Sequence, residues 1–483
     1  MEYTMKITTY KQIPAKKKAA CRLVFVNSKG DVLAGPKKLA DDLTPFVENG
    51  EFGKSFGTPF YIPSTGTRTL YMNMGEKKAT AIQFRRATGK AVKLLKPKNI
   101  KTLYIDCQGL DEASVRAVVE GVTLGSYDYL DYKSDKDQAP KSLEEMSLNL
   151  KNTGVTLKKV QAWSSISDGV NLARDLMLQP PNDLYPETLA KKAKQLEKEG
   201  CFKAQILKQP EIEKENMNAL LSVSQGSEKA PRFIIMDYNP KGAKKTFVLV
   251  GKAVTFDSGG LSLKPSSAMP EMKGDMGGGA TVFGIMASLE KIQCPHRVVG
   301  LVPSVENMPS GTATRPSDVV ISRAGISIEI NNTDAEGRLI LADALDYAKN
   351  FKPDYVIDYA TLTGACLVAL GPKICGIMGN HQKLVDAMVK VGYSLDDPFW
   401  QLPLEEDYEA LLKSDVADVS NIANTRWGGT ITAGLFLQRF AKDYKWAHCD
   451  IAASILEKPD DFNPKGGSGA GVRTTIEVFD KMS

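Results

Sequence analysis

Apolar segments of strand length alternate regularly with loops and helical segments from residue 246 onward. We expect strands at residues 247–252, 297–302, 326–331 and 355–359, and helices at residues 278–292 and 339–349. Apolar strands that alternate with helices are typical of a doubly wound, largely parallel sheet. Ligands of such sheets bind at the carboxyl ends of the strands. The loops that follow the strands are therefore the places to look for functional side chains.

A less regular alternation of the same kind occupies the amino-terminal third of the chain. Strands are expected at residues 6–10, 22–27, 69–73 and 102–107, and helices at residues 79–95 and 112–124. The segment 131–152, rich in Lys, Asp, Glu and Ser, is interpreted as the end of this part. A chain of 483 residues exceeds what one hydrophobic core usually organises. We therefore predict two α/β domains, a smaller one at 1–155 and a larger one at 156–483 that begins with a linker helix at 160–177.

The composition favours a cytoplasmic protein. Residues 1–12 contain no apolar core of the kind that a secretory signal requires, and the longest apolar runs are much shorter than a membrane span. Seven cysteines are scattered singly, without a CxxC pair. Buried thiols in a reducing compartment explain this pattern better than disulfides or zinc ligands.

One stretch of the sequence is locally basic. Nine positive residues follow one another without an acid between them: Lys77, Lys78, Arg85, Arg86, Lys90, Lys93, Lys96, Lys98 and Lys101. A solvated helix face followed by a loop is the favoured interpretation. A surface that binds DNA through its phosphates is the alternative, because the formal net charge of +5 is too small to decide.

Two loops after expected strands are unusually rich in acids and bases. The first contains Lys252, Asp257, Lys264 and Asp275, and the second contains Asp334, Glu336 and Arg338. Each acid has a plain alternative role, since Asp257 could belong to a turn and Asp334 could cap a helix. Together the four acids exceed what turns and caps need, because burying them without compensation would be very costly. A pair of divalent cations would supply that compensation.

Neither of these two loops contains a histidine. His296, His381 and His448 are far apart in the sequence, and no HExxH motif occurs. Any metal must therefore be held mainly by carboxylates. Sites of this kind are compatible with zinc, manganese, magnesium or cobalt.

Three segments resemble the signature sequences of the leucine aminopeptidase (cytosol aminopeptidase) family. They are KAVTFDSGGLSLKP at 252–265, KGDMGGGA at 273–280 and NNTDAEGRL at 331–339. The likeness spans about residues 165–483, whereas before residue 155 only the domain size and the α/β pattern agree. The resemblance implies a hydrolase that removes single residues from the free amino end of peptides, as a homohexamer. It also implies an amino-terminal domain similar in fold to macro domains, for which we favour a role in assembly.

The resemblance assigns a role to each charged residue of the two loops. Asp257 and Glu336 correspond to ligands that bridge two metal ions. Asp334 corresponds to a ligand of one ion, and Lys252 and Asp275 to ligands of the other. The metals implied are zinc or manganese. Lys264 and Arg338 match the two family positions that act without binding metal.

The resemblance also implies how a substrate would be bound. The family positions near the substrate are Met272, Asn332, Thr361, Leu362, Gly364 and Ala453, although a role in the core is an equal alternative for Met272. The implied preference is for leucine-like terminal residues. A water shared by the metals would attack the peptide carbonyl, while Lys264 stabilises the resulting oxyanion. No histidine lies nearby as a base, and the resemblance suggests a bicarbonate ion held at Arg338 and the amides of 335–339.

Overall fold

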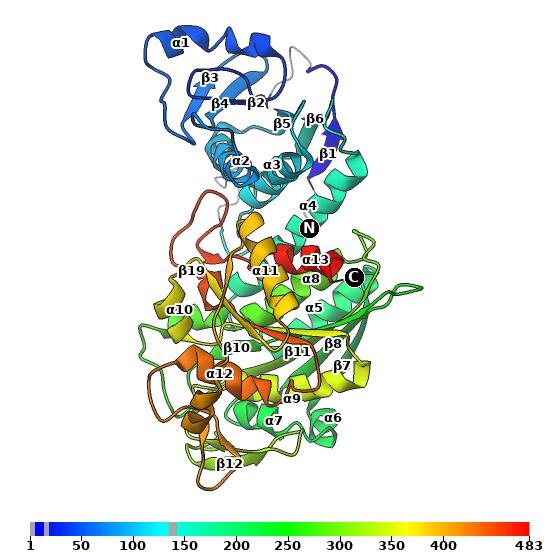
Figure 1. The fold of residues 1–483 in the computed structure, drawn as a ribbon, viewed down its shortest axis with the longest axis vertical. Coiled ribbons are helices and arrows are strands. Elements are labelled where there is room, and N and C mark those ends of the chain that lie inside the picture. The colour runs from blue at the N-terminus through cyan, green and yellow to red at the C-terminus, as the bar shows by residue number, and fades with distance from the viewer. Residues whose placement is uncertain (1–4, 14–18, 135–142, 483) are drawn as a thin grey trace. The chain divides into compact units, whose positions relative to one another are not determined.

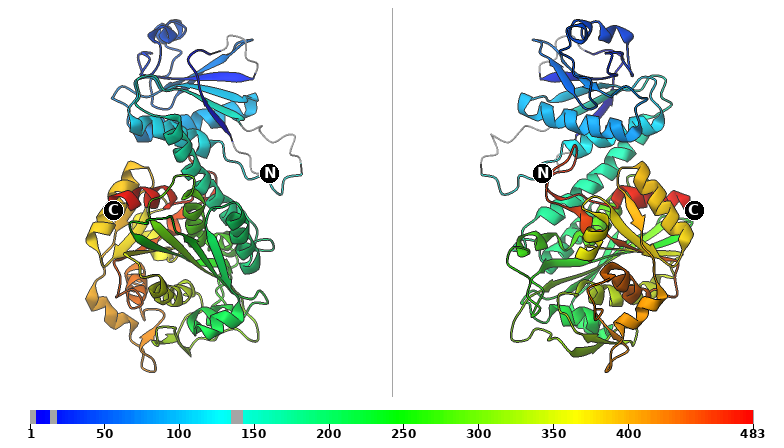
Figure 2. Two further views of the ribbon diagram at one scale, coloured as in Figure 1. Left: turned by 90° about the vertical axis from the view of Figure 1, so that its right-hand side faces the viewer. Right: turned by 60° about the vertical axis from the view of Figure 1, so that its left-hand side comes forward.

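The chain divides into two compact units in a computed structural model, which describes residues 5–13, 19–134 and 143–482 (Figures 1 and 2). Unit 1 comprises Met1–Asp168 together with Pro459–Pro464, and unit 2 comprises Gly169–Lys458 and Lys465–Ser483. Both units are of the α/β class. The middle of the charged segment 131–152 lies outside the described residues.

Unit 1 contains a six-stranded sheet with the order β1-β6-β5-β2-β4-β3. Its strands are β1 Lys6–Thr9, β2 Ala20–Val26, β3 Pro59–Ile62, β4 Arg68–Asn73, β5 Thr102–Asp106 and β6 Glu145–Asn149. All neighbours are parallel except β3, which runs antiparallel to β4 at the edge. The sequence analysis did not predict β3 or β6. Strand β6 lies inside the segment interpreted as a domain end, yet it is inserted between β1 and β5.

Two helices of unit 1, α2 (Ala81–Leu95) and α3 (Glu112–Gly125), pack closely against each other. The close approach depends on Gly121, because a Cβ atom there would lie only 2.6 Å from the carbonyl oxygen of Arg85. Arg85 and Glu120 form a buried ion pair of 2.7 Å between the helices. Two shorter helices, η1 (Lys37–Ala40) and α1 (Thr44–Glu48), follow β2, and η2 (Lys96–Lys98) follows α2.

The segment Pro459–Pro464, which we call the inserted segment, belongs to unit 1 although it comes late in the chain. Phe462 is only 3% exposed. A Cβ atom on Gly89 of α2 would lie 2.7 Å from the Cβ of Phe462, so only glycine fits there. Lys93 donates to the backbone carbonyls of Asp460 and Asn463. The packing of unit 1 is thus completed by residues far along the sequence.

Unit 2 is built around a nine-stranded sheet with the order β16-β15-β18-β14-β9-β11-β8-β7, in which β10 also pairs with β11. The strands are β7 Lys203–Leu207, β8 Arg232–Tyr238, β9 Thr246–Gly251, β10 Ala253–Asp257, β11 Arg297–Asn307, β14 Tyr355–Ala360, β15 Cys375–Gly379, β16 Phe399–Gln401 and β18 Trp446–Asp450. The central strands β18, β14, β9 and β11 are parallel to one another. Strands β8 and β15 run antiparallel to their central neighbours, β7 runs antiparallel to β8, and β16 runs parallel to β15. This arrangement confirms the mostly parallel sheet.

Helices cover both faces of this sheet (Figure 1). One face carries α8 (Gly277–Ser288), α11 (Gln382–Ser394) and α13 (Val472–Lys481), and the other carries α7 (Asn218–Ser224), α9 (Gly337–Tyr347) and α12 (Gly429–Gln438). Successive residues of β9 point to opposite faces. The ring of Phe247 lies 4.6 Å from that of Phe479 in α13, whereas Val248 joins a cluster with Leu341 of α9. Burial on both faces explains why the strand is apolar throughout.

The remaining elements surround the sheet. They are α4 Leu157–Leu178, α5 Pro186–Lys198, α6 Gln209–Lys214, α10 Gly364–Leu370, η3 Met269–Gly274, η4 Ala348–Phe351, η5 Glu406–Leu412, η6 Ala452–Ser454, the small sheet of β12 Asp318–Ile321, β13 Ser327–Ile330 and β17 Val419–Ser420, and the pair β19 Ile455–Leu456 and β20 Gly466–Gly467. The expected strand 326–331 is β13 and does not join the main sheet. Within the described residues, no helix combines the length and apolarity needed to cross a membrane.

Candidate metal centre

The two acidic loops meet at the carboxyl ends of the central strands. Lys252 follows β9 directly, and Asp257 is the last residue of β10. Asp275 lies between η3 and α8, while Asp334 and Glu336 lie between β13 and α9. The parallel course of β9 and β10 beside β11 brings the start of the first loop to one edge, and ion pairs of Glu336 with Lys252 and of Asp334 with Lys264 join the second loop to it. This is the edge at which sheets of this type bind ligands.

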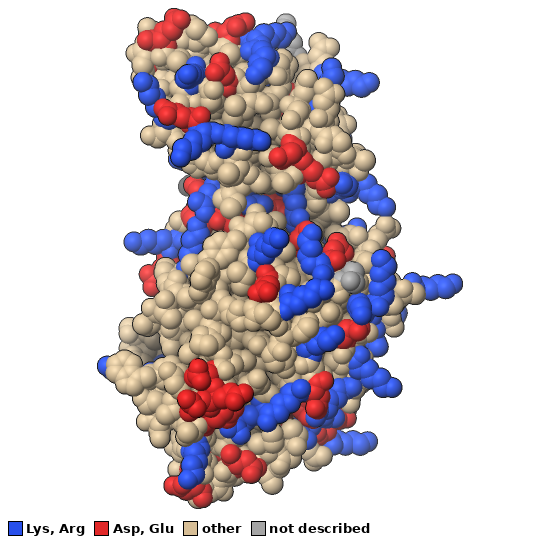
Figure 3. All heavy atoms as spheres, viewed as in Figure 1, with Lys and Arg blue, Asp and Glu red and all other residues tan. Residues whose placement is uncertain are grey.

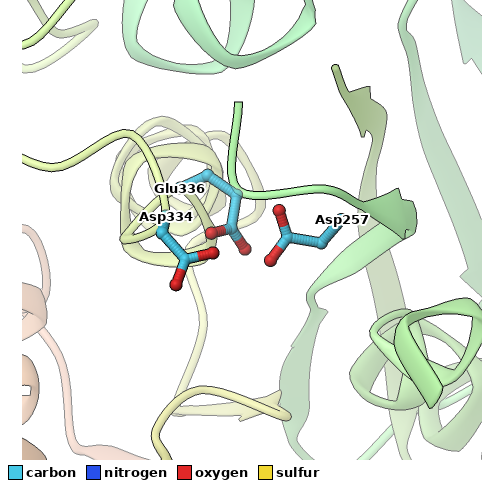
Figure 4. Close-up of side chains that lie close together, drawn as sticks. All are labelled: Asp257, Asp334 and Glu336. Carbon is cyan, nitrogen blue, oxygen red and sulfur yellow. The ribbon is translucent and has the colours of Figure 1, made fainter. Parts of the chain in front are cut away.

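Three carboxylates form the centre of the site. Asp257, Asp334 and Glu336 each offer an oxygen, and these oxygens lie within 4.8 Å of one another. Figure 4 shows Asp257 reaching toward the other two from the opposite side. Asp257 and Glu336 are only 1% and 2% exposed. Such crowding of buried acids requires positive charge close by.

Two lysines connect the acids into one cluster. The Nζ of Lys252 lies 2.9 Å from Asp275 and 2.8 Å from Glu336. The Nζ of Lys264 lies 2.8 Å from Asp257 and 2.5 Å from Asp334. The structure thus brings together all five side chains predicted to be ligands. Lys264, which was not predicted to be a ligand, lies in the same cluster.

The protonation equilibria of the acids reflect this crowding. Burial raises the pKa of Asp257 and of Asp275, and repulsion from Glu336 raises both further. Burial also raises the pKa of Asp334. Although burial lowers the pKa of Lys252, attraction to Asp275, Glu336 and Asp257 outweighs it, so the pKa is raised. The two lysines therefore do not fully compensate the charge of the four carboxylates.

The chemistry of the cluster fits divalent cations. Asp275 Oδ2, Asp334 Oδ1 and Glu336 Oε1 are buried, and among the described residues none of them accepts a properly oriented hydrogen bond. Each lies beside a lysine nitrogen without the geometry of such a bond. Carboxylate oxygens that crowd together around two lysines, in a cluster deficient in positive charge, suit hard or borderline divalent metals.

Asn307 holds the first loop and joins it to the second. Its side-chain amide donates to Asp257 Oδ1 at 2.8 Å and to the carbonyl of Thr333 at 3.0 Å. The amide of Gly259 also donates to Asp257 Oδ1, at 2.9 Å. Gly259 has a φ of +88°, which L-residues rarely adopt, so the loop depends on glycine there. These contacts fix one oxygen of Asp257 and leave the other facing the cluster.

Asn421 plays the same part for the second loop. Its side chain donates to the carbonyl of Asn332 at 2.7 Å and accepts from the amide of Asn331 at 2.9 Å. Its backbone carbonyl accepts a hydrogen bond of 2.7 Å from Arg338. The sequence analysis missed both Asn307 and Asn421, because neither belongs to a motif. The only signal is that each is polar and stands at or just after the end of a strand.

Arg338 lies in the first turn of α9 and is 7% exposed. Burial lowers the pKa of its guanidinium to about 10. Its Nε is buried and has no hydrogen-bond partner among the described residues. A buried cation with an unused donor at the amino end of a helix favours an anion as neighbour.

The residues expected near the substrate occupy segments around the cluster. The hydroxyl of Thr361 donates to Asp275 at 2.8 Å, and its carbonyl accepts from Lys252 at 3.1 Å. The side chain of Asn332 accepts from the amide of Asp334 at 2.8 Å. Thr361 and Asn332 therefore contact predicted ligands directly.

The other four expected substrate residues are Met272, Leu362, Gly364 and Ala453. The carbonyl of Met272 accepts from the amide of Asp275 at 3.2 Å. Leu362 is half-buried, and Gly364 is the exposed first residue of α10. Ala453 is buried in η6, beside which α10 packs. These segments border the cluster on the side of Asp275 and Thr361.

Comparison with known proteins gives consistent matches. The model for the catalytic domain of the cytosol aminopeptidase family matches residues 171–476, and the model for the family's N-terminal domain matches residues 73–136. A protein named "Probable cytosol aminopeptidase" from Chlorobaculum tepidum is 40% identical over 479 residues, which is 93% of each chain. A protein of the same name from Geobacter sp. is 42% identical over 445 residues, which is 90% of each chain.

Solved structures agree with the sequence matches. The bottromycin maturation enzyme BotP in complex with Mn has a TM-score of 0.85 and 33% identity, covering 96% of this chain and 99% of that one. The cytosol aminopeptidase from Coxiella burnetii has a TM-score of 0.83 and 32% identity, covering 98% and 99%. The chain therefore belongs to the cytosol aminopeptidase family and is a metal-dependent aminopeptidase.

Proposed function

We propose that this aminopeptidase uses two divalent cations to remove leucine-like residues from the free amino end of peptides. The observation that supports the proposal is the single buried cluster formed by Lys252, Asp257, Asp275, Asp334 and Glu336. Asp257 and Glu336 would contact both cations, Asp334 one of them, and Lys252 and Asp275 the other. When bound, such a pair supplies a water of lowered pKa and a Lewis acid for the scissile carbonyl.

Lys252 must release its proton to act as a ligand. In the cluster its ammonium group is hydrogen-bonded to the carbonyl of Thr361 and paired with two acids. The nitrogen is therefore already oriented toward the acids that would share a cation with it. Positive charge in the same place would favour the neutral amine.

Lys264 would stay charged and stabilise the oxyanion. Burial lowers its pKa, but Asp257 and Glu336 raise it by more. Its ammonium group is less buried than that of Lys252 and faces Asp257 and Asp334 from the other side of the cluster. A fixed positive charge there would attract the negative oxygen that develops during peptide hydrolysis.

Arg338 would hold a small anion such as bicarbonate, which could accept a proton from the attacking water. The unpartnered Nε of Arg338 and the amino end of α9 support this role. Removal and return of bicarbonate is the direct test. We expect turnover to fall in bicarbonate-free buffer and to recover when bicarbonate is added. Unchanged turnover would contradict the role.

The substrate's terminal side chain would be bound by Met272, Thr361, Leu362, Gly364 and Ala453, with Asn332 on the side of Asp334. Most of these residues are small or apolar, which supports a preference for residues of leucine size. None of these six side chains carries a charge that could pair with a terminal Lys or Asp.

The central experiment compares peptides with free and blocked amino ends. We expect leucyl peptides with a free amine to be hydrolysed, the N-acetylated forms to be left intact, and a chelator to abolish hydrolysis. Hydrolysis of acetylated peptides, or full activity in the presence of chelator, would refute the proposal. Reconstitution with zinc or manganese, followed by elemental analysis, would identify the metal. The solved relative in complex with Mn supports manganese as the first metal to test.

Binding of DNA through residues 77–101 stays a prediction, but the structure weakens its basis. Several of the nine positive residues are committed to partners: Arg85 to Glu120, Lys93 to the inserted segment, Lys96 to Asp128 and Lys101 to Glu144. On the face drawn in Figure 3, acids and bases are interspersed over unit 1. Salt-sensitive retention on duplex DNA that is lost when Lys77, Lys78 and Lys90 become Gln would support such binding.

We also propose a homohexamer in the cytoplasm, with unit 1 serving in assembly. All seven cysteines are free and buried, as expected in a reducing compartment. Light scattering of the purified protein would measure its mass directly. A mass other than that of six chains would contradict the proposed assembly.

A further inference from the structure

Asp450 is a buried acid that lies outside the cluster of predicted ligands. It is the last residue of β18 and is 0% exposed. Its Oδ1 accepts from the amides of Leu362 and Ala452, each at 3.2 Å, and from the amide of Thr363 at 3.4 Å. Its Oδ2 accepts from the hydroxyl of Thr363 at 2.7 Å. One carboxylate thus joins two segments that are some 90 residues apart in the sequence.

The first of these segments is the turn after β14. Strands β14 and β18 are parallel neighbours, with Ala360 opposite Asp450. The turn begins with Thr361, whose hydroxyl and carbonyl contact Asp275 and Lys252. The predicted ligands Asp275 and Lys252 therefore hold one end of the turn, and Asp450 holds the other end.

The second segment is η6, which contains Ala453. Asp450 binds the amide of Ala452 at the start of η6. Since α10 begins directly after the turn and packs beside η6, both segments lie next to each other. They contribute Leu362, Gly364 and Ala453, which are three of the residues expected to contact the substrate's side chain.

We propose that Asp450 is a positioning residue that sets the width of the pocket for the terminal side chain. This inference rests on the proposed function, because it concerns the same substrate. Asp450 does not touch the substrate or the metals. Its oxygens fix the distance between the turn after β14 and η6, so leucine-sized residues are favoured over smaller ones only while both segments are held.

Thr363 transmits the effect of Asp450 to α10. It is the N-cap of α10, and its Oγ1 accepts from the amide of Cys366 at 3.1 Å. The same hydroxyl lies 2.9 Å from that of Thr430. Valine has the same shape as threonine but lacks the hydroxyl, whereas serine keeps it. The pair Thr363→Val and Thr363→Ser therefore separates the hydrogen bonds from the packing.

The test measures kcat and KM of the full-length, manganese-loaded protein for leucyl and alanyl peptides. We expect Asp450→Ala to lower the leucyl-over-alanyl ratio of kcat/KM at least about tenfold, mainly through KM for leucyl peptides. Asp450→Asn keeps an oxygen for the three amides and should restore most of the ratio. Thr363→Val should act like Asp450→Ala, and Thr363→Ser like the unchanged protein.

Asp397→Ala provides the matched control. Asp397 is also a buried acid of unit 2, and it accepts from the amide of Gly471 and the hydroxyl of Thr474. Its loss should lower the unfolding temperature without changing the leucyl-over-alanyl ratio. Asp450→Ala and Asp397→Ala can then be compared at similar stability.

Two results would overturn the inference. An unchanged leucyl-over-alanyl ratio in both Asp450→Ala and Thr363→Val would show that the pocket does not depend on Asp450. A parallel loss of bound manganese would show that Asp450 supports the ligands instead. If Asp450→Ala does not fold, the leucyl-over-alanyl ratio of Thr363→Val alone tests the inference, and an unchanged ratio there would overturn it. Failure of the proposed function is distinguishable, because the unchanged protein would then hydrolyse neither peptide.

Discussion

Each charged residue of the predicted ligand cluster depends on the charge of its neighbours. Lys252 and Lys264 each contact two acids, so replacing one lysine alters the electrostatic environment of the two acids that it contacts. The two lysines differ in what they can do. Lys252 lies between Asp275 and Glu336 in full burial, whereas Lys264 keeps some contact with solvent. This difference supports a ligand role for the first and an electrostatic role for the second.

Replacing Lys264 tests the electrostatic role. We expect Lys264→Ala to lower kcat by about 10²- to 10³-fold, the loss typical of removing one oxyanion donor. Bound metal, measured by elemental analysis, should change little. Comparable losses of metal and turnover would mean that Lys264 is needed for the structure of the cluster.

Replacing Asp257 tests the predicted ligand set. We expect Asp257→Asn to bind less manganese than the unchanged protein, because a neutral amide cannot serve two cations as a carboxylate does. The matched control is Asp237→Asn, which removes an acid of β8 that pairs with Arg297. Equal manganese content in both variants would argue against Asp257 as a ligand.

The motif residues of the site could be predicted from the sequence, but their supports could not. Asp257, Asp334 and Glu336 stand in short motifs, so local order alone identifies them. Asn307 and Asn421 act through hydrogen bonds to residues between 26 and 90 positions away. Such pairs depend on how strands are ordered in the sheets, which periodicity within one segment does not encode.

Secondary-structure elements were predictable where they are long and apolar. Strand β9, strand β14 and helix α9 lie within a few residues of their expected positions. Strand β10 was missed because only Lys252 separates it from β9, so the sequence shows one apolar run. Strand β13 was predicted but lies in a separate three-stranded sheet. Its pattern specifies a strand without specifying a partner.

Helix α9 contains a buried acid that should make stability depend on pH. Asp343 is 0% exposed and accepts from the amides of Leu220 and Arg323. Burial raises its pKa to about 7, and nearby Asp346 contributes. The side chain of Arg323 is itself paired with Asp346 and Glu215. The folded protein therefore binds the proton on Asp343 more tightly than the unfolded chain does.

The direction of the effect follows from this difference. The stabilisation is complete below the unfolded pKa of about 3.9 and is lost as the pH rises through about 7. Each pH unit between the two pKa values is worth about 1.4 kcal/mol. We expect the free energy of unfolding to fall between pH 5 and pH 8 by less in Asp343→Asn than in the unchanged protein. Denaturant titrations at both pH values measure the free energy of unfolding. An equal fall in this free energy in the two proteins would contradict the prediction.

At the scale of the whole molecule, each unit has hydrophobic core residues of its own. One cluster gathers Leu23, Phe25 and Val118 of unit 1, and another gathers Val248, Leu341 and Trp446 of unit 2. All predicted ligands belong to unit 2. A ligand that binds only the folded state stabilises the part that holds it. Metal should therefore act mainly on the unfolding of unit 2.

Calorimetry with and without metal tests this assignment. We expect added manganese to raise the unfolding temperature of one transition, and a chelator to lower it. The Asp257→Asn variant should show a smaller shift. An equal shift in both proteins would indicate that manganese stabilises the molecule at another place.

The inserted segment has a consequence for synthesis on the ribosome. Residues 1–168 are synthesised early, and Pro459–Pro464, which completes the packing of unit 1, is synthesised only much later. Until then the surface beside Gly89 lacks Phe462. Unit 1 is thus synthesised first but completes its packing late. A nascent chain that stalls before residue 459 would leave the surface beside Gly89 open to chaperones.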